Sequence, residues 1–472
     1  MKKKILSATL IYGVLTFLQP LTSFLLLPIY LQIFDADEYG ILSLMNNYTN
    51  LLGLIGALGI GGAFVSFFFD YYHNEERLKK FLGQVLSFSF YTTLLLGGLL
   101  LIFGGPLFRF IFKSDAIVYY PYGFLATLTG LLMCIEEPFR IYLRNKKELL
   151  KYTGIVLCNF ILTVVVQLIL ILVLDYGIKG ALIGRLTGVS VNAMIVVFWS
   201  RKHLTFRLDW RYLIKPLRFI KFLLPGTLLR WIYVLGDRFI IERLLTLVQV
   251  GLYSLLSNLV HAVEMVYFAL LTAILPYLSE AYVLKGTERT QKLATLYNYY
   301  LSLTILAIFG VIMLVGNIHF VVSNQKYLAI QQYANILALG YLFSSFNHLL
   351  YYEFYFYKDS KTVLKYAILS VTMMVGLNLL LLAKYQLWGV VLASLISRVC
   401  VLIVLFLWNK EKFVPFQNRR IYASIVMAMT LIAGTEILIR YYNYSLSLLS
   451  IGQFGIMLLS LLFLNKNFRR ER

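Results

Sequence analysis

Apolar runs of about 20 residues recur along the whole chain, each long enough to cross a hydrocarbon core about 30 Å thick. Because lipid offers the backbone no hydrogen-bond partners, such segments cross a membrane as helices or as strands of a closed barrel. The alternating segments of about 10 residues that are typical of a membrane barrel are missing. With 60% hydrophobic and only 14% charged residues, the sequence predicts an all-α polytopic membrane protein.

Hydropathy predicts about 14 transmembrane helices joined by short loops. We place them at residues 6–33, 40–69, 81–112, 117–143, 152–174, 179–200, 216–245, 247–279, 292–316, 329–357, 362–384, 387–408, 420–440 and 445–464. No segment between them is long enough for a separate soluble domain, so binding must take place within the helical bundle. The basic start of the chain leads into an apolar run without a small-residue cleavage site, which favours a retained first helix over a cleaved signal peptide.

The net charge of +21 would suggest a nucleic-acid partner in a soluble protein. Here the basic residues gather at both termini and in alternate loops, such as Lys79–Lys80 and Arg201–Lys221. The intervening loops hold few of them, and the first, "IFDADEYG", is acidic. This asymmetry predicts that both termini are cytoplasmic, and it accounts for the basic surplus without nucleic acid.

The first half of the chain echoes the second. "YGILSLMNN" matches "VGLYSLLSN", so that Gly40 falls on Gly251, a shift of 251 − 40 = 211 residues. "YGIKGALIG" matches "YQLWGVVLA", so that Gly180 falls on Gly389, a shift of 389 − 180 = 209. We therefore expect two six-helix lobes related by a pseudo-twofold axis along the membrane normal. The predicted divisions are an N-terminal lobe at 1–205, a C-terminal lobe at 206–412, and two additional helices with a basic tail at 413–472.

Several stretches resemble a known family. "LLLPIYLQIFDADEYGILSL" is similar to the entry of the polysaccharide exporters, and "FLLPGTLLRWIYVLGDRFIIERLLTLVQVGLYSLLSN" is similar to their seventh and eighth helices. The "GALIG" and "GVVLAS" starts of the sixth and twelfth helices fit as well. Over essentially its whole length, the chain resembles the Wzx-like polysaccharide flippase branch of the multidrug/oligosaccharidyl-lipid/polysaccharide exporter (MOP) superfamily.

This resemblance implies a transporter that flips a polyprenyl-diphosphate-linked oligosaccharide by alternating access. The substrate would pass from the cytoplasmic to the outer face of the bacterial cytoplasmic membrane, for the biosynthesis of O-antigen, capsule or a similar surface polysaccharide. It also implies two lobes around a hydrophilic, often cationic cavity. We expect a monomer without enzymatic activity or cofactor, with other polysaccharide assembly proteins as possible partners.

Four arginines fall inside predicted spans, where an Arg at the bilayer centre costs at least about 2.5 kcal/mol. They are Arg185, Arg230, Arg238 and Arg398. We interpret the first, second and fourth as lining a wet cavity, where guanidinium groups could bind diphosphate oxygens in a bidentate manner. For Arg238, pairing with Asp237 or a lock at the outer gate is the favoured interpretation. The alternative for all of them is internal ion pairing, with Asp237, Glu264, Glu353 and Glu436 as candidate partners.

The acidic and amide side chains of the spans have two interpretations each. Asp237, Glu264, Glu353 and Glu436 could couple transport to an H⁺ or Na⁺ gradient or act at a gate, because a desolvated carboxyl exchanges protons more readily near neutrality. They could equally be hydrogen-bonded groups that fix packing. Asn46, Asn47 and Asn258 could line the cavity or tie helices together.

Other classes of function lack their signatures in this sequence. No phosphate-binding glycine-rich loop, metal cluster or Ser/His/Asp arrangement occurs at a recognisable spacing. A membrane-embedded glycosyltransferase or polymerase would usually carry a sizeable polar loop with catalytic residues. Within transport, the alternatives are a multidrug exporter and a peptidoglycan-precursor flippase of the same superfamily. An exporter of organic cations would favour carboxylates over arginines in its cavity, whereas the precursor flippase also handles a diphosphate.

Overall fold

The predicted fold class is confirmed by the computed structural model, which is helical throughout its regular structure. It describes residues 15, 18, 22–56, 58–202, 204, 207–316, 325–357 and 360–408. Among these residues there is no strand. Six of their helices are long and apolar enough to cross a membrane, or seven if one bent pair counts as a single span. The full span count and the lobe symmetry stay predictions, because the spans expected at 420–440 and 445–464 lie outside the described residues.

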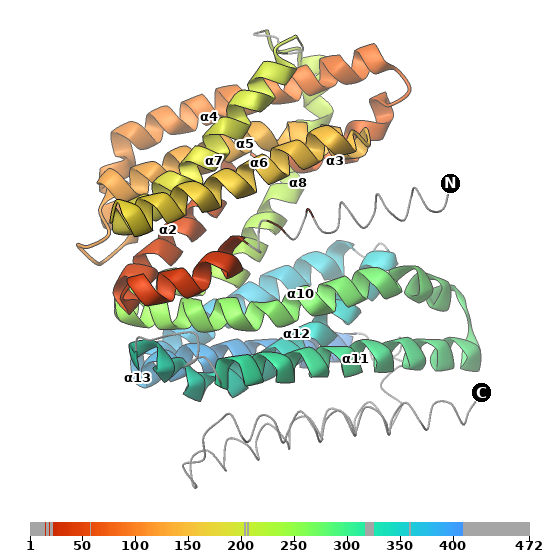
Figure 1. Ribbon diagram of the computed structural model, residues 1–472. Helices are drawn as coiled ribbons and strands as arrows, with labels where there is room; N and C mark the ends of the chain where they lie inside the picture. The colour runs from red at the N-terminus through yellow and green to blue at the C-terminus, as the bar shows by residue number, and fades with distance from the viewer. Residues whose placement is uncertain are drawn as a thin grey trace. The chain divides into compact units, whose positions relative to one another are not determined.

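The chain divides into two compact units, Met1–Gly251 and Leu252–Arg472 (Figure 1). This division is based on the packing of the helices. The lobe boundary at 205/206 is predicted from the internal duplication instead, and it stays a prediction. The described part of the first unit includes a short apolar helix, Thr22–Ile33. Its further helices are α2 (Ala36–Ile55), α3 (Ile60–Tyr71), α4 (Glu75–Ile111), η1 (Tyr119–Gly123), α5 (Phe124–Asn145), α6 (Leu149–Leu168), η2 (Ile169–Val173), α7 (Gly177–Ser200), α8 (Trp210–Leu235) and α9 (Asp237–Leu244).

Local sequence signals explain where several of these helices begin. The backbone amide of Asp35 donates to Glu38 Oε2 at 3.1 Å, so the acidic loop closes the start of α2. Asn74 does the same for α4, because its Oδ1 accepts from the amide of Arg77 at 3.0 Å. The charged residues of "IFDADEYG" therefore have a structural role at a helix start.

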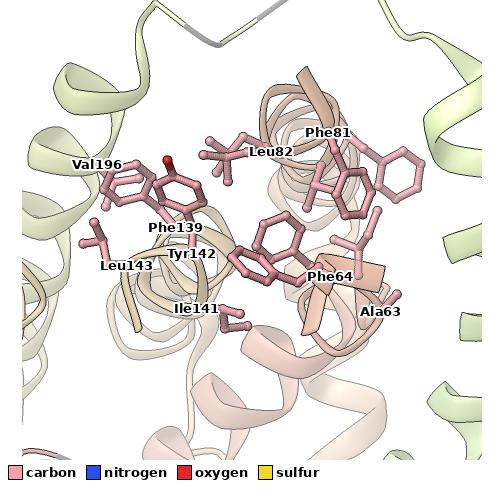
Figure 2. Close-up of a cluster of buried hydrophobic side chains, with 14 of the residues drawn as sticks. Ala63, Phe64, Phe81, Leu82, Phe139, Ile141, Tyr142, Leu143 and Val196 are labelled. Atoms are coloured by element: carbon pink, nitrogen blue, oxygen red, sulfur yellow. The ribbon is translucent and has the colours of Figure 1, made fainter. Parts of the chain in front are cut away.

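Apolar side chains from α3, α4, α5 and α7, many of them aromatic, form a core of the first unit (Figure 2). Phe64 and Phe81 lie with ring centroids 5.1 Å apart, and Phe139 stacks on Tyr142 at 5.9 Å. All four of these rings are buried, as is Val196 of α7. The core fixes the positions of α5 and α7 against each other, which matters for the polar groups that these helices carry.

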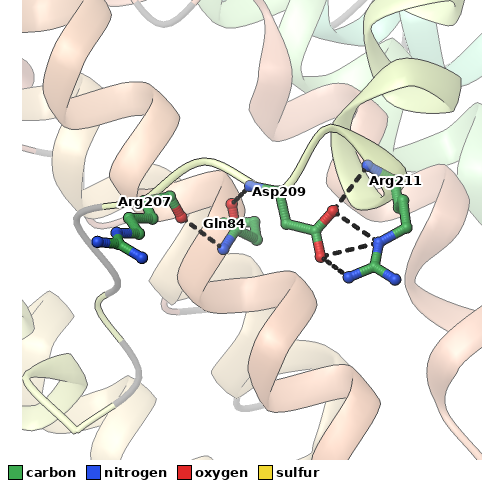
Figure 3. A network of polar contacts seen from close by, with 4 residues as sticks. All are labelled: Gln84, Arg207, Asp209 and Arg211. Atoms are coloured by element: carbon green, nitrogen blue, oxygen red, sulfur yellow. Dashed lines mark hydrogen bonds and ion pairs between the residues drawn. The ribbon is translucent and has the colours of Figure 1, made fainter.

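The segment that leads into α8 is held against α4 by one buried glutamine (Figure 3). Gln84 Nε2 donates to the carbonyl of Arg207 at 3.1 Å, and its Oε1 accepts from the amide of Asp209 at 2.7 Å. Asp209 in turn accepts from the amide of Arg211 at 3.0 Å and caps α8. Hydrogen bonds from the Arg211 side chain and backbone hold the pKa of Asp209 below its usual value.

The second unit comprises most of α10 (Leu247–Val283), α11 (Gly286–Gly316), η4 (Gln325–Ile330), α12 (Gln331–Phe356) and α13 (Ser360–Trp408). Buried side chains of α12 and α13, among them Leu350, Phe354, Val401 and Leu405, pack into one apolar cluster. α10 joins α12 through the hydroxyl groups of Tyr267 and Ser344, which lie 3.3 Å apart. The helices predicted from residue 40 to residue 408 all have counterparts in the two units.

α13 is two helical arms rather than one straight helix. Gln386 has φ of 50° and ψ of −130°, and a Cβ on Gly389 would touch the carbonyl oxygen of Leu381. Residues eight apart in a straight helix would be about 12 Å apart along its axis, so the chain reverses here. The arms correspond to the separate spans predicted at 362–384 and 387–408.

A similar reversal occurs in the first unit, between η2 and α7. Gly177 has φ of 54°, and a Cβ on Gly180 would lie 3.1 Å from Leu170 Cβ. Adding the predicted repeat shift of 209 to 177 and 180 gives 386 and 389, the positions of the reversal in α13. The two hairpins thus share a left-handed residue followed three positions later by a closely packed glycine, which supports the proposed duplication.

Candidate functional site

Arg185 is a half-buried cation of the first unit. It lies on α7, eight residues and roughly 12 Å from the helix start at Gly177. Its Nη1 donates to Asn46 Oδ1 at 2.5 Å, and its Nη2 donates to Asn50 Oδ1 at 2.9 Å. Both asparagines lie on α2, one turn apart, so a single face of α2 orients the guanidinium group.

The contacts of Arg185 leave its charge uncompensated. Among the described residues no carboxylate lies within ion-pair distance of it. Two neutral amide oxygens satisfy two of its five N–H donors without cancelling the charge. A guanidinium group held in this way in a membrane helix can bind an anion without first breaking an ion pair.

Neighbouring contacts fix the helix that carries Arg185. The hydroxyl group of Tyr30 donates to Gln167 Oε1 at 2.6 Å, and Gln167 Nε2 donates to the carbonyl of Ala181 at 2.7 Å. Gly184, next to Arg185, lies so close to Gln167 that a Cβ there would overlap its side chain. These contacts join α6, α7 and the helix at 22–33, and so limit how far Arg185 can shift.

The other two predicted cations of the first unit differ from Arg185. Arg230 is exposed on α8. Arg238 on α9 is buried and donates from Nη1 to Asp237 Oδ1 at 2.9 Å and to the carbonyl of Val234 at 3.0 Å. Asp237 is buried with it, so this pair forms an internal ion pair at the junction of α8 and α9.

α9 is also tied to the end of α4. The buried carboxylate of Glu242 accepts from the backbone amides of Lys113 and Ser114, both through Oε1, at 2.9 and 2.8 Å. Arg243 Nη1 donates to the carbonyl of Phe110 at 2.8 Å. Both charged residues at this end of α9 thus contact the backbone that follows or ends α4.

In the second unit the predicted residues gather around Glu264 of α10. Its Oε2 lies 2.8 Å from His261 Nδ1, and His348 of α12 and Arg398 of α13 are within electrostatic reach of its carboxylate. The guanidinium group of Arg398 stacks over the ring of Tyr341, 4.2 Å from its centroid. Unlike Arg185, Arg398 therefore has a carboxylate in its surroundings.

The remaining predicted residues lie apart from these two groups. Glu353 is buried and forms an ion pair with Arg289 of α11, with Nη2 and Oε1 3.1 Å apart. Asn47 is buried and Asn258 half-buried. Glu436 lies outside the described residues. No group of three or more His, Cys, Asp or Glu side chains within the described ranges is placed to hold a metal ion.

Sequence reasoning missed Asn50, Arg289 and Tyr341. The position of Asn50 four residues after Asn46 is a helical repeat that could have flagged it as part of the same face. Arg289 and Tyr341 carry no such signal, because each was read as part of a basic loop or of an apolar span.

Comparison with known proteins identifies the family of the chain. The family model described as "Polysaccharide biosynthesis protein" matches residues 5–282, which is more than half of the chain. The chain belongs to the polysaccharide biosynthesis protein family. Among curated proteins, no sequence shows significant similarity to it.

Solved structures share the fold of this polysaccharide biosynthesis protein at low sequence identity. The lipid II flippase MurJ in an inward closed conformation has a TM-score of 0.74 at 15% identity, covering 97% of this chain and all of MurJ. An inward-facing multidrug resistance MATE family transporter of the MOP superfamily has a TM-score of 0.62 at 17% identity, with 80% and 93% covered. The MATE transporter VcmN of Vibrio cholerae, as a D35N mutant, has a TM-score of 0.52 at 14% identity, with 88% and 100% covered. The fold is thus that of multi-pass flippases and transporters.

Proposed function

We propose that this polysaccharide biosynthesis protein flips a polyprenyl-diphosphate-linked oligosaccharide from the cytoplasmic to the outer face of the bacterial cytoplasmic membrane. The observation that carries the proposal is Arg185, a cation on a membrane helix that is held by amides and has no carboxylate partner among the described residues. A diphosphate supplies the missing negative charge and accepts from the planar guanidinium group in a bidentate manner. Family membership supports polysaccharide precursors as the class of substrate.

The other polar groups have subsidiary roles in this proposal. Arg398, beside Glu264, provides a weaker anion contact in the second unit, and Arg230 provides an exposed one on α8. The Asp237–Arg238 pair stiffens the junction of α8 and α9. Glu264 with His261 is the candidate for coupling to an ion gradient in the second unit, because that carboxylate already faces titratable partners.

The first prediction concerns Arg185. Arg185→Ala should reduce export at least about tenfold, since a hydrogen bond to a charged group is worth about 1.5–3 kcal/mol. Arg185→Lys should restore only part of it, because an ammonium group lacks the bidentate geometry. Export is measured as surface polysaccharide in cells that depend on the variant, and as translocation of a short-chain lipid-linked oligosaccharide in proteoliposomes.

Controls separate this role from folding and from general charge. Arg201→Ala removes a cation that stacks on Phe198 at the far end of the same helix, and it should export normally. Asn46→Ala with Asn50→Ala should give an intermediate defect, because the guanidinium group keeps its charge and loses its orientation. Normal export by Arg185→Ala at an unchanged membrane level would remove this residue from the site.

The alternatives within the superfamily are tested in the same strain. A peptidoglycan-precursor flippase would rescue growth when the cell's own lipid II flippase is depleted. A multidrug exporter would change susceptibility to organic cations without changing surface polysaccharide. We expect neither effect, and either one in place of a polysaccharide defect would contradict the proposal.

A further inference from the structure

The first unit also contains a buried acidic pair that the proposed substrate site does not use. Glu136 and Glu137 lie on α5, and Arg140 acts electrostatically on both. Arg140 Nη1 lies 3.4 Å from Glu136 Oε1, which is longer than the roughly 2.7–2.9 Å of a charge-assisted hydrogen bond. Two carboxylates that share one guanidinium group would leave a net charge of −1 inside the bundle.

The surroundings favour the charge on Glu137. A Cβ on Gly61 would lie 2.9 Å from Glu137 Cδ, so this carboxylate packs against the first turn of α3. The N-terminus of a helix attracts negative charge through its free N–H groups and its dipole. Arg144 also acts on Glu137. Glu137 is therefore stabilised as an anion by more than Arg140 alone.

Glu136 has no comparable support. Its side chain is 1% exposed, and its Oε2 has no hydrogen-bond partner. Asn192 of α7 lies beside it and is also 1% exposed, with neither amide atom in a hydrogen bond of acceptable geometry. Phe139 follows Glu136 on α5 by about one helical turn, and Val196 follows Asn192 on α7 in the same way. Both belong to the apolar core (Figure 2). Polar atoms left unpartnered in such a place destabilise the fold.

We propose that Glu136 and Asn192 form a proton-binding site, in which Glu136 holds one exchangeable proton that it donates to Asn192 Oδ1. The proton comes from bulk water and forms one O–H bond on Oε2, which turns the carboxylate into a neutral acid. Oε1 then faces Arg140 as a neutral carbonyl oxygen, while Arg140 and the ionised Glu137 balance each other. The net charge of the group becomes zero, and the unpartnered Oε2 gains an acceptor.

The charged and titratable groups around the site are consistent with a proton as the ligand. α5 supplies Glu137, Arg140 and Arg144, α6 supplies the hydroxyl group of Tyr152 facing Arg140, and α7 supplies Asn192. A metal cation bound by Glu136 would lie next to the Arg140 guanidinium group and be repelled by it. The Arg140 side chain is 27% exposed, so the site is not sealed on the side of Arg140.

Loss of this proton would place an uncompensated charge between α5 and α7. The site therefore makes the packing of these helices depend on pH, whatever substrate the protein carries. Glu136→Gln reproduces the shape and neutrality of the protonated acid, so it should fold.

Infrared spectroscopy of the purified full-length protein tests the proposal, because a protonated carboxyl has a carbonyl band separate from those of carboxylates and amides. At neutral pH the wild type should show this band, with a shift in D₂O, and Glu136→Gln should lose it. Glu137→Gln should keep it, as should the control Glu76→Gln, which removes an exposed carboxylate paired with Lys80. Asn192→Leu should move the band to higher frequency, because the acid loses its acceptor.

Four results would overturn the proposal. The carbonyl band could be absent from the wild type, or it could persist in Glu136→Gln. It could also be lost in Glu137→Gln alone, or disappear when Na⁺ is added at constant pH. The last would mean that a metal cation occupies the site.

A second readout is the thermal unfolding midpoint, which should fall more steeply with rising pH in the wild type than in Glu136→Gln. Parallel curves for the two proteins would likewise contradict proton binding at Glu136.

Discussion

Two glycines, Gly40 of α2 and Gly251 of α10, lie backbone to backbone in the first unit. A Cβ on Gly40 would touch the carbonyl of Leu247, and one on Gly251 would touch the carbonyl of Ala36. These are the glycines that the repeat alignment matches at a shift of 211. Their hydrogen side chains allow a close approach of backbones of the kind that small residues permit between membrane helices.

Gly251→Ala should therefore destabilise the protein by about 1–3 kcal/mol, the usual cost of inserting a methyl group into a packed contact. The apparent unfolding midpoint in detergent measures this. Gly98→Ala is the matched control, because Gly98 is in a helix and has nothing within 4 Å of its would-be Cβ. Equal midpoints for the two variants would mean that the contact at Gly251 is loose enough to absorb a methyl group.

At the same scale, the sequence identified Arg185 but not the manner in which it is held. An arginine in an apolar span is conspicuous because few charges occur there. Its partners Asn46 and Asn50 could be recognised only once the facing sides of α2 and α7 were known. Arg230, which the sequence predicts to line the same cavity, is exposed on α8, because hydropathy does not report which side of a helix faces a neighbour.

Among the helices, the junction of α9 with α4 depends on one carboxylate. Glu242 accepts from two backbone amides that follow the end of α4. Glu242→Ala would leave both partly buried donors without this partner, so we expect a loss of about 1–3 kcal/mol in total at about 0.5–1.5 kcal/mol per hydrogen bond. Hydrogen exchange of residues 110–116, with the unfolding midpoint, provides the measurement.

The control for this prediction is Glu280→Ala. Glu280 pairs with Lys292 at 3.0 Å on an exposed surface, where ion pairs contribute about 0–1 kcal/mol. If both variants lower the midpoint equally, the contact of α9 with α4 does not contribute as the geometry indicates.

The spans were predictable because each is a long apolar run, whereas their internal breaks were not. Hydropathy gives no sign that the span at 40–69 breaks between α2 and α3, or that 216–245 breaks between α8 and α9. Hydropathy is averaged over a window about as long as the span. A single residue with a left-handed φ, such as Leu58, therefore leaves the mean hydropathy of the span unchanged. Breaks of this kind are decided by contacts with other helices.

For the whole molecule, the distribution of basic residues predicts the orientation in the membrane. In a background without Cys134, Cys158 and Cys400, single cysteines at Lys80→Cys and Lys285→Cys should react with an impermeant maleimide only after spheroplasts are permeabilised. Asp115→Cys should react before permeabilisation. All three positions are exposed. The opposite pattern would reverse the predicted orientation, and a mixed pattern would change the number of spans between these loops.

The reversal at Gln386 bears on how the chain is assembled during synthesis. Its two arms touch at Leu381 and Gly389, and the turn between them is short, so that little polar chain has to be carried across the lipid with it. Each arm satisfies its own backbone hydrogen bonds. The translocon can therefore release the pair laterally as a preformed helical hairpin, and the same holds for the hairpin that turns at Gly177.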